Sequence, residues 1–147
     1  MNIKTIIILP LIILIIGFIS CQRFFSLNNN HPDNDTIYNH VWNLESVKNI
    51  NGDLMLIPDS AWEFSVEFDL DGSLYVISAC NTGEGIFSIK TGDSLDIEIG
   101  CTEMACNANY QGYCDDLNHA TRFDLSNDQL SIYFTNRSGN QRVLIHE

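Results

Sequence analysis

Five cysteines are the residues of this chain whose side chains are best suited to covalent or metal chemistry: Cys21, Cys80, Cys101, Cys106 and Cys114. The last four are an even number in what we expect to be an exported domain, which predicts two disulfide bonds with three possible connectivities. A four-cysteine zinc site is the alternative, but a C-x4-C-x7-C spacing over the last three fits the common zinc modules poorly. A nucleophilic cysteine is disfavoured because no histidine lies in a recognisable catalytic motif.

Carboxylates form two further groups that could do chemistry. Asp69-x-Asp71-Gly72 resembles a fragment of a calcium-binding loop, but the remaining oxygen ligands and the closing glutamate are missing, so the segment predicts a hairpin turn. Asp115 and Asp116 are adjacent, and without an apolar cleft to raise a pKa we interpret them as a solvated helix surface. The chain has neither a G-x-S-x-G nor an H-E-x-x-H motif. We therefore expect no catalytic residue, no metal site, no cofactor and no enzymatic activity.

The N-terminus has the layout of an export signal. Lys4 precedes a long apolar run, and the run ends in small residues before Cys21. Residues 18–21, Phe-Ile-Ser-Cys, resemble the lipobox of bacterial lipoproteins. The resemblance implies that residues 1–20 are cleaved as a signal peptide and that Cys21 carries lipid, so that acyl chains hold the protein stably on a membrane. An uncleaved transmembrane anchor and a soluble secreted protein are the alternatives.

A polar segment separates this anchor from the domain. Residues 21–38 contain an asparagine run and Pro32 and lack apolar periodicity, so we expect a lipidated cysteine followed by a flexible tether, with the folded domain at 39–147. Gln22, rather than an acid, follows the lipidated cysteine. By analogy with enteric lipoprotein sorting, this favours the outer membrane over the inner membrane of the cell envelope.

The formal net charge of −12 limits the possible partners. A protein this acidic is repelled by phosphate backbones, so we expect no nucleic-acid partner. Solvation is the simplest role of the charge, and attraction of a basic protein partner is the alternative.

Period-two alternation dominates the chain from Trp42 onward. The clearest case is 63–70, which predicts a strand that buries Phe64, Val66, Phe68 and Leu70. Turn residues separate the strands, as at Asp71-Gly72. Further strands are expected at 73–80, 86–90 and 94–99, and around Phe123, Leu130-Ile132-Phe134 and Val143-Ile145; 81–85 is expected to be a turn. The pattern predicts a mainly β domain, a small antiparallel meander that closes or nearly closes into a barrel.

One helix is expected after Cys106. Asn107 is a candidate N-cap, and Tyr110, Tyr113, Cys114 and Leu117 have the spacing of one helical face. If Cys106 and Cys114 bracket this helix, their Cα atoms lie about 12 Å apart, beyond the roughly 7 Å that a disulfide spans. Two connectivities then remain open.

Several motifs together resemble the META domain, also called HslJ-like, over about residues 41–146. They are Trp42-x-Leu44, Phe68-Asp69-Leu70-Asp71-Gly72, Ala79-Cys80-Asn81, Leu95-x-Ile97 and Thr102-Glu103-Met104-Ala105-Cys106. The resemblance implies a small barrel-like fold with one packed helix, here short. It also implies a Cys80–Cys106 disulfide, with Cys101–Cys114 as a second one. The chain departs from the family at Ala79, where a glycine is usual.

These observations favour a non-catalytic envelope module, a monomeric domain that binds protein or contributes to stress tolerance. On the expected strands the acids fall outside the barrel: Glu63, Glu67, Asp69, Asp96 and Glu98. The alternative is a lipocalin-like barrel that binds a small apolar ligand. Large residues on the inward faces argue that the interior is filled: Phe64, Phe68, Leu95, Ile97 and Phe134.

Overall fold

The computed structural model describes residues 37–126 and 128–147. The predicted signal peptide, Cys21 and the tether up to residue 36 lie outside the described residues. Within them, no helix has the length and apolar character needed to cross a membrane.

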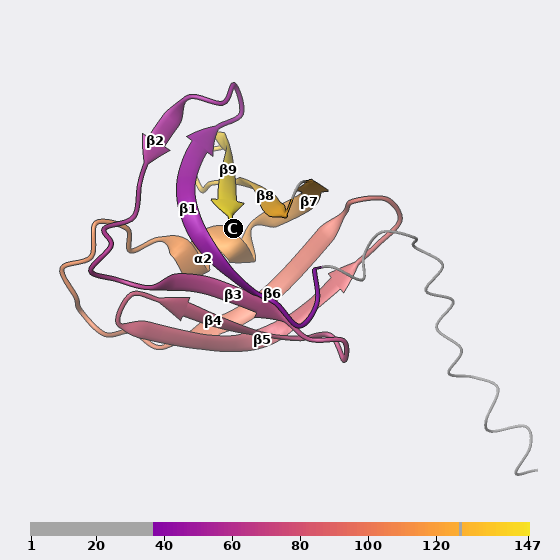
Figure 1. Cartoon of the computed structure of the whole chain (residues 1–147), viewed down its shortest axis with the longest axis horizontal. Helices are drawn as coiled ribbons and strands as arrows, with labels where there is room; N and C mark the ends of the chain where they lie inside the picture. Colours follow the sequence, from indigo (N-terminus) through magenta and orange to yellow (C-terminus); the bar gives the residue numbers. More distant parts are fainter. Residues whose placement is uncertain (1–36, 127) are drawn as a thin grey trace, which may run out of the picture. The chain divides into compact units, whose positions relative to one another are not determined.

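A nine-stranded antiparallel sheet forms most of the described part (Figure 1). Its spatial order is β6-β5-β4-β3-β1-β9-β8-β7, and β2 pairs with β1 beside this path. The strands are β1 (Val41–Asn49), β2 (Leu54–Leu56), β3 (Phe64–Phe68), β4 (Ser73–Ser78), β5 (Asn81–Ile89), β6 (Leu95–Cys101), β7 (Ala120–Ser126), β8 (Gln129–Thr135) and β9 (Gln141–His146). The short helix α2 (Tyr113–Asn118) lies between β6 and β7 in the chain. The sequence did not predict β2.

Strand β1 joins the two halves of the sheet. Its first residues pair with β3, and its later residues pair with β9 after an irregularity between Leu44 and Ser46. Figure 1 shows β1 curving from the β3–β6 half toward β8 and β9. A bulge bends a strand and increases its twist, which brings the two ends of the sheet toward each other.

The ends of the sheet meet over a short stretch. Ser94 pairs with Arg122, and the Phe123 N–H donates to the Asp93 carbonyl at 2.9 Å. Beyond this bridge the edge strands β6 and β7 separate, and α2 lies against β6. The prediction of a mainly β, nearly closed antiparallel barrel with one short packed helix is confirmed.

The barrel interior is filled by the inward side chains that the alternation predicted. The five large inward residues named from the sequence are all buried: Phe64, Phe68, Leu95, Ile97 and Phe134. Leu70 is a correction, because 71% of it is exposed. The β3–β4 turn begins one residue earlier than expected, with the Gly72 N–H donating to the Asp69 carbonyl. Leu70 and Asp71 are therefore the central turn residues.

The predicted turn at residues 81–85 is wrong, since this segment begins β5. The chain turns earlier, at Ala79 and Cys80. Gly83 and Gly85 lie within the strand because β6 approaches so closely there. A Cβ atom at Gly85 would collide with the Glu98 carbonyl oxygen. The glycines indicate close approach of a neighbouring strand.

The helix is shorter than predicted. Gly112, not Asn107, occupies the N-cap position, and no side chain caps the helix there. Cys106 therefore lies outside the helix, so the argument that excluded a Cys106–Cys114 disulfide on helical geometry had a wrong premise. Tyr110 is buried as expected, but from a loop.

The folded domain includes two residues that the sequence analysis placed in the tether. Ile37 is completely buried, and its carbonyl accepts a hydrogen bond from the Trp42 indole N–H at 2.9 Å. Tyr38 pairs with Phe68 at the end of β3. The domain therefore begins at or before Ile37 rather than at residue 39.

Candidate interaction site at the disulfide end of the barrel

Both cysteine pairs lie at the end of the barrel where β4 turns into β5 and β6 ends. Cys80 is bonded to Cys106 and Cys101 to Cys114, with Cα–Cα distances of 6.2 and 6.5 Å. Both distances lie within the range that disulfides span. The pairs are those that the META resemblance implied. They tie the loop after β6 to the β4–β5 corner, and the start of α2 to the end of β6.

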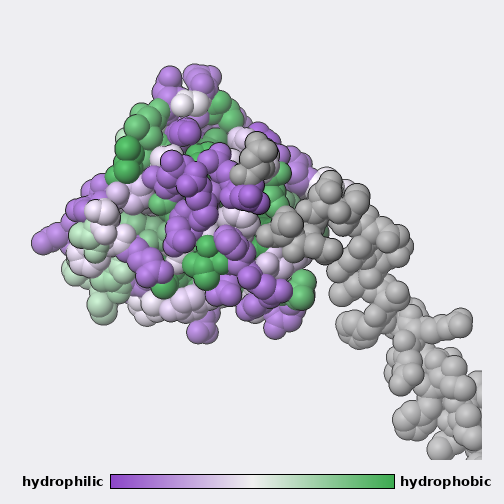
Figure 2. Space-filling model, viewed as in Figure 1, coloured by the Kyte–Doolittle hydropathy of each residue, from purple (hydrophilic) through white to green (hydrophobic). Residues whose placement is uncertain are grey.

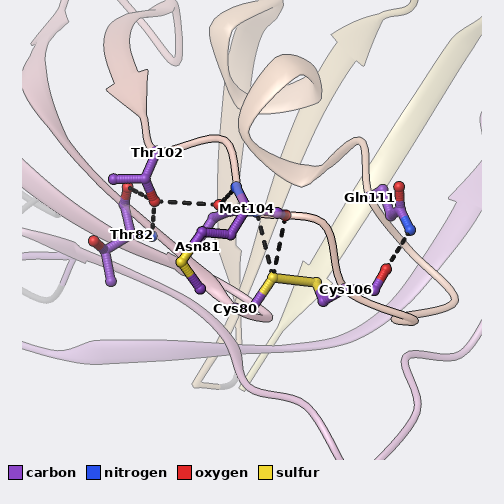
Figure 3. Close-up of a disulfide and its surroundings, with 7 residues drawn as sticks. All are labelled: Cys80, Asn81, Thr82, Thr102, Met104, Cys106 and Gln111. Carbon is purple, nitrogen blue, oxygen red and sulfur yellow. Dashed lines mark hydrogen bonds between the residues drawn. A yellow bond between two sulfur atoms is a disulfide. The ribbon is translucent and has the colours of Figure 1, made fainter.

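The loop that carries Met104 is held by the side chain of Asn81 (Figure 3). The Met104 N–H donates to Asn81 Oδ1 at 2.6 Å, and Asn81 Nδ2 donates to the Met104 carbonyl at 3.2 Å. One side-chain amide thus satisfies both backbone groups of one residue, as a neighbouring strand would.

Thr102 extends this attachment toward β5. Its N–H donates to the Thr82 carbonyl at 2.9 Å, and its hydroxyl accepts a hydrogen bond from the Thr82 N–H at 3.1 Å. At the far end of the loop, Gln111 Nε2 donates to the Cys106 carbonyl at 2.8 Å (Figure 3). The loop of residues 102–106, the clamped loop, is therefore fixed along its length, and it leaves Met104 59% exposed.

A surface groove of about 470 Å³ lies beside the clamped loop. Its other walls come from the Ala79 corner, from α2, and from Arg137 in the β8–β9 turn. Arg137 donates to Asp115 at 2.6 Å, and this hydrogen bond raises the pKa of Arg137. Glu103 also lines the groove. The groove is therefore largely polar, and its lining includes the exposed apolar side chain of Met104, whose backbone is fixed by Asn81.

Of the adjacent acids of α2, one lines this groove and the other is enclosed in the core. Asp116 was expected on a solvated surface, but it is buried and accepts a hydrogen bond from the Tyr110 hydroxyl. Its burial raises its pKa. Asp115 remains partly exposed. No cluster of three histidine, cysteine or acidic residues in the described ranges could hold a metal ion.

The sequence analysis did not identify a second buried polar pair, formed by Tyr113 and His146. The Tyr113 hydroxyl and His146 Nε2 are 2.8 Å apart, and both residues are completely buried. Burial lowers the pKa of His146 to about 3, so the ring is neutral at physiological pH. The pair joins α2 to the last strand and is enclosed by the core, so we assign it a structural role.

The acidic turn Asp69–Gly72 closes the β3–β4 hairpin. Asp71 Oδ1 accepts hydrogen bonds from the Ser73 N–H at 2.9 Å and from the Ser73 hydroxyl at 2.6 Å. These bonds lower the pKa of Asp71. Asp69 and Asp71, the two acids of the fragment that resembles a calcium-binding loop, thus stabilise the hairpin turn.

Residues 35–146 match the family model of the META domain. The chain belongs to the META-domain family. The geometry above explains two META motifs of the sequence, because the T-x-M-A-C segment is the clamped loop and the Cys80-Asn81 pair holds it. In this META domain the motif residues fix the backbone of the clamped loop. The sequence analysis did not predict this structural role.

Two solved structures share the fold. One is an NMR structure of a protein from Burkholderia xenovorans, with a TM-score of 0.52 and 18% identity over 76% of this chain and 83% of that one. The other is a crystal structure of a DUF4847 family protein from Bacteroides vulgatus, with a TM-score of 0.56 and 15% identity over 76% of this chain and 94% of that one. At these identities the likeness concerns the fold alone. No curated protein matches the chain.

Proposed function

We propose that this chain is a lipid-anchored, non-catalytic envelope protein whose META domain binds a protein partner at the disulfide end of the barrel. The observation that carries the proposal is the clamped loop. Two disulfides and the Asn81 amide fix it, yet Met104 stays exposed beside the groove. A loop whose backbone is already fixed loses little backbone conformational entropy on binding, and the flexible Met104 side chain can adapt to a partner's apolar surface.

The absence of catalysis is part of the proposal. The four cysteines of the domain are paired, and Asp116 is enclosed. Among the polar side chains that line the groove, Asn81 and Thr102 already bond to backbone, and Arg137 is bonded to Asp115. An active site needs polar groups that converge on substrate, and Asn81 and Thr102 converge on the loop itself.

The anchor follows from the N-terminal sequence. Lys4, the apolar run and the Ser20-Cys21 junction support cleavage before Cys21 and lipid on that residue. Gln22, rather than an acid, after the lipidated cysteine supports attachment to the outer membrane. We propose that the domain acts as a monomer on this anchor.

A basic protein is the partner that the charge favours. The chain carries a net charge of −12, and the acids on the outer face of the sheet include Glu67, Asp96 and Glu98. Such a surface attracts cationic partners and repels nucleic acid. The lipocalin-like alternative is weaker, because buried side chains such as Phe68 and Leu95 fill the space that a ligand would need.

Photo-crosslinking in cells tests the binding proposal. A benzophenone amino acid at Met104 should capture a partner, and the same amino acid at Leu70 is the matched control, because Leu70 is also apolar and exposed but lies at the opposite end of β4. The yield at Met104 should fall when the salt concentration of isolated envelopes is raised, because salt screens exposed charges. Equal capture at both positions would contradict the proposal.

Metabolic labelling with a fatty-acid analogue tests the anchor separately. The wild-type chain should incorporate the label, and Cys21→Ser should not. Equal labelling of the two proteins would contradict lipidation at Cys21 and would leave the binding proposal standing.

A further inference from the structure

Exposed apolar side chains gather on the hairpin formed by the end of β1 and by β2. Ile50, Leu54, Met55 and Ile57 are 48–61% exposed and lie within eight residues of one another. Figure 2 shows hydrophobic atoms together at the place where Figure 1 draws β2. Scattered exposed apolar residues are ordinary, whereas a contiguous group is typical of an interaction surface.

Strand β2 also has a free backbone edge. In the part of the chain that the structure describes, it pairs with β1 alone, through Val47–Leu56 and Lys48–Leu54. Figure 1 draws it outermost, beyond β1. An unpaired edge offers N–H and C=O groups to an added strand, and several peptide-binding domains use such an edge in this way.

The hairpin is held in place by asparagine side chains at both ends. Asn49 Oδ1 accepts hydrogen bonds from the N–H groups of Asn51 and Asp53. Beyond β2, Asn109 Nδ2 donates to the Ile57 carbonyl at 2.9 Å, and its Oδ1 accepts from the Asp59 N–H at 3.0 Å. The edge is therefore presented in a fixed conformation, which reduces the entropy lost when a strand is added.

The charges around β2 indicate which kind of protein segment could bind at its free edge. An exposed carboxylate lies on each side of the strand, Asp53 immediately before it and Asp59 three residues after it. Neither acid makes an ion pair with a described residue. The nearby cations, Lys48 and Arg142, lie on the inner strands β1 and β9. The free edge is thus apolar at its centre and acidic at its ends.

We propose that the edge of β2 binds an extended, basic segment of a partner protein by strand addition, with apolar side chains of the segment on Leu54 and Met55 and cationic ones near Asp53 and Asp59. This surface is distinct from the groove at the disulfide end. A second copy of this chain is disfavoured because it has the same strongly negative charge.

A bilayer is the alternative occupant of the hairpin. The chain enters the described domain at Ile37, beside the start of β1, and the hairpin extends from the other end of that strand. The exposed acids Asp53 and Asp59 favour a cationic protein segment, and the vesicle comparison below tests the lipid surface.

The test uses the full chain in detergent micelles and a seven-residue probe peptide with two lysines at each end and Val-Thr-Val between them. Fluorescence anisotropy should show binding of this peptide. A peptide with glutamates in place of the lysines should bind at least tenfold more weakly. N-methylation of alternate backbone nitrogens should also weaken binding at least tenfold, since it removes the strand hydrogen bonds.

Three variants locate the site. Leu54→Ser should abolish binding, whereas Ile86→Ser, at a residue of similar exposure on β5, should leave it unchanged. Asp53→Asn and Asp59→Asn should each weaken binding about three- to fivefold at low salt, as expected for exposed charges. Thermal melting checks that each variant is folded.

Four results of the experiments in micelles would overturn the proposal. They are equal binding of the glutamate peptide, equal binding of the N-methylated peptide, binding that survives Leu54→Ser, and self-association of the chain that Leu54→Ser removes. The affinity should also be the same in phosphatidylcholine vesicles as in micelles. A loss of binding in vesicles would assign the hairpin to the lipid surface and would equally overturn it. All of these outcomes are independent of crosslinking at Met104.

Discussion

The side-chain amide of Asn118 makes two hydrogen bonds with the backbone of Ile99. The Ile99 N–H donates to Asn118 Oδ1 at 2.8 Å, and Asn118 Nδ2 donates to the Ile99 carbonyl at 3.0 Å. Ile99 lies in β6, the edge strand at which the barrel fails to close. Asn118, at the end of α2, therefore takes the place of the missing neighbouring strand, as Asn81 does for Met104.

Replacing Asn118 should open this edge. Asn118→Ala removes both bonds and should lower the free energy of unfolding by about 1–3 kcal/mol. Asn118→Asp should be at least as harmful, because a carboxylate cannot donate to the Ile99 carbonyl. Urea unfolding measures both, with Asn107→Ala as the control at an exposed asparagine. A change equal to that of the control would show that the two bonds contribute nothing to stability.

At Ala79, in contrast, a substitution should stabilise the domain. Its φ is +58°, in the left-handed region that disfavours a Cβ atom by about 1–2 kcal/mol. Ala79→Gly removes this penalty, and the greater freedom of glycine in the unfolded chain offsets about 0.4–1 kcal/mol. The net gain should be about 0.5–1 kcal/mol in urea unfolding.

The control for Ala79 is Ala105→Gly. Ala105 lies in the clamped loop and is not among the described residues with positive φ. This variant should be neutral or destabilised. Stabilisation of both variants to the same extent would contradict the conformational explanation.

The sequence predicted most strands of this fold but few of the contacts at the candidate site. Alternation identified β6 and β8, along which burial alternates, and β3, whose apolar face is buried although Ser65 on its other face is buried as well. It failed at 81–85, where glycines that resemble a turn allow close strand approach. It also missed β2, whose short Leu-Met-Leu run does not alternate.

The cysteine pairing and the asparagine contacts show why local patterns are not enough. Composition predicted two disulfides, but only the family resemblance implied which cysteines pair, because connectivity depends on contacts distant in sequence. The sequence placed Asn81 in a turn and Asn109 in the expected helix, and nothing near these residues or Asn118 identifies the backbone that each binds. The sequence-based prediction of lipid on Cys21 stays a prediction.

The two disulfides should contribute comparable stability. They close loops with sequence separations of 26 and 13 residues. In the chain-entropy model such loops correspond to about 3.5 and 3 kcal/mol. The paired alanine variants Cys80→Ala with Cys106→Ala, and Cys101→Ala with Cys114→Ala, should lose about these amounts in urea unfolding.

Peptide mapping by mass spectrometry without reduction supplies the control for the disulfide variants. It should recover the Cys80–Cys106 and Cys101–Cys114 peptides from the wild type and one intact pair from each variant. Free thiols on all four cysteines of the wild-type domain, or any other pairing, would contradict the structure.

The stability of the domain should fall in acid because of His146. Its pKa is lowered to about 3 in the folded state by burial, against 6.5 when exposed. The unfolded chain therefore binds the proton first as the pH falls. The contribution of His146 is complete above pH 6.5 and is lost progressively between pH 6.5 and about 3, by at most about 1.4 kcal/mol per pH unit.

Protonation of Asp116 has the opposite effect on the stability of the domain, so its contribution must be separated from that of His146. Burial raises the pKa of Asp116, so its protonation favours the folded state as the pH falls. His146→Gln removes the titrating ring, keeps an acceptor for the Tyr113 hydroxyl and leaves Asp116 unchanged. The difference in unfolding free energy between wild type and His146→Gln, measured in urea at several pH values, isolates the histidine. The wild-type advantage should shrink steadily below pH 6.5, and a difference independent of pH from 7 to 4 would show that His146 is not the acid-sensitive group.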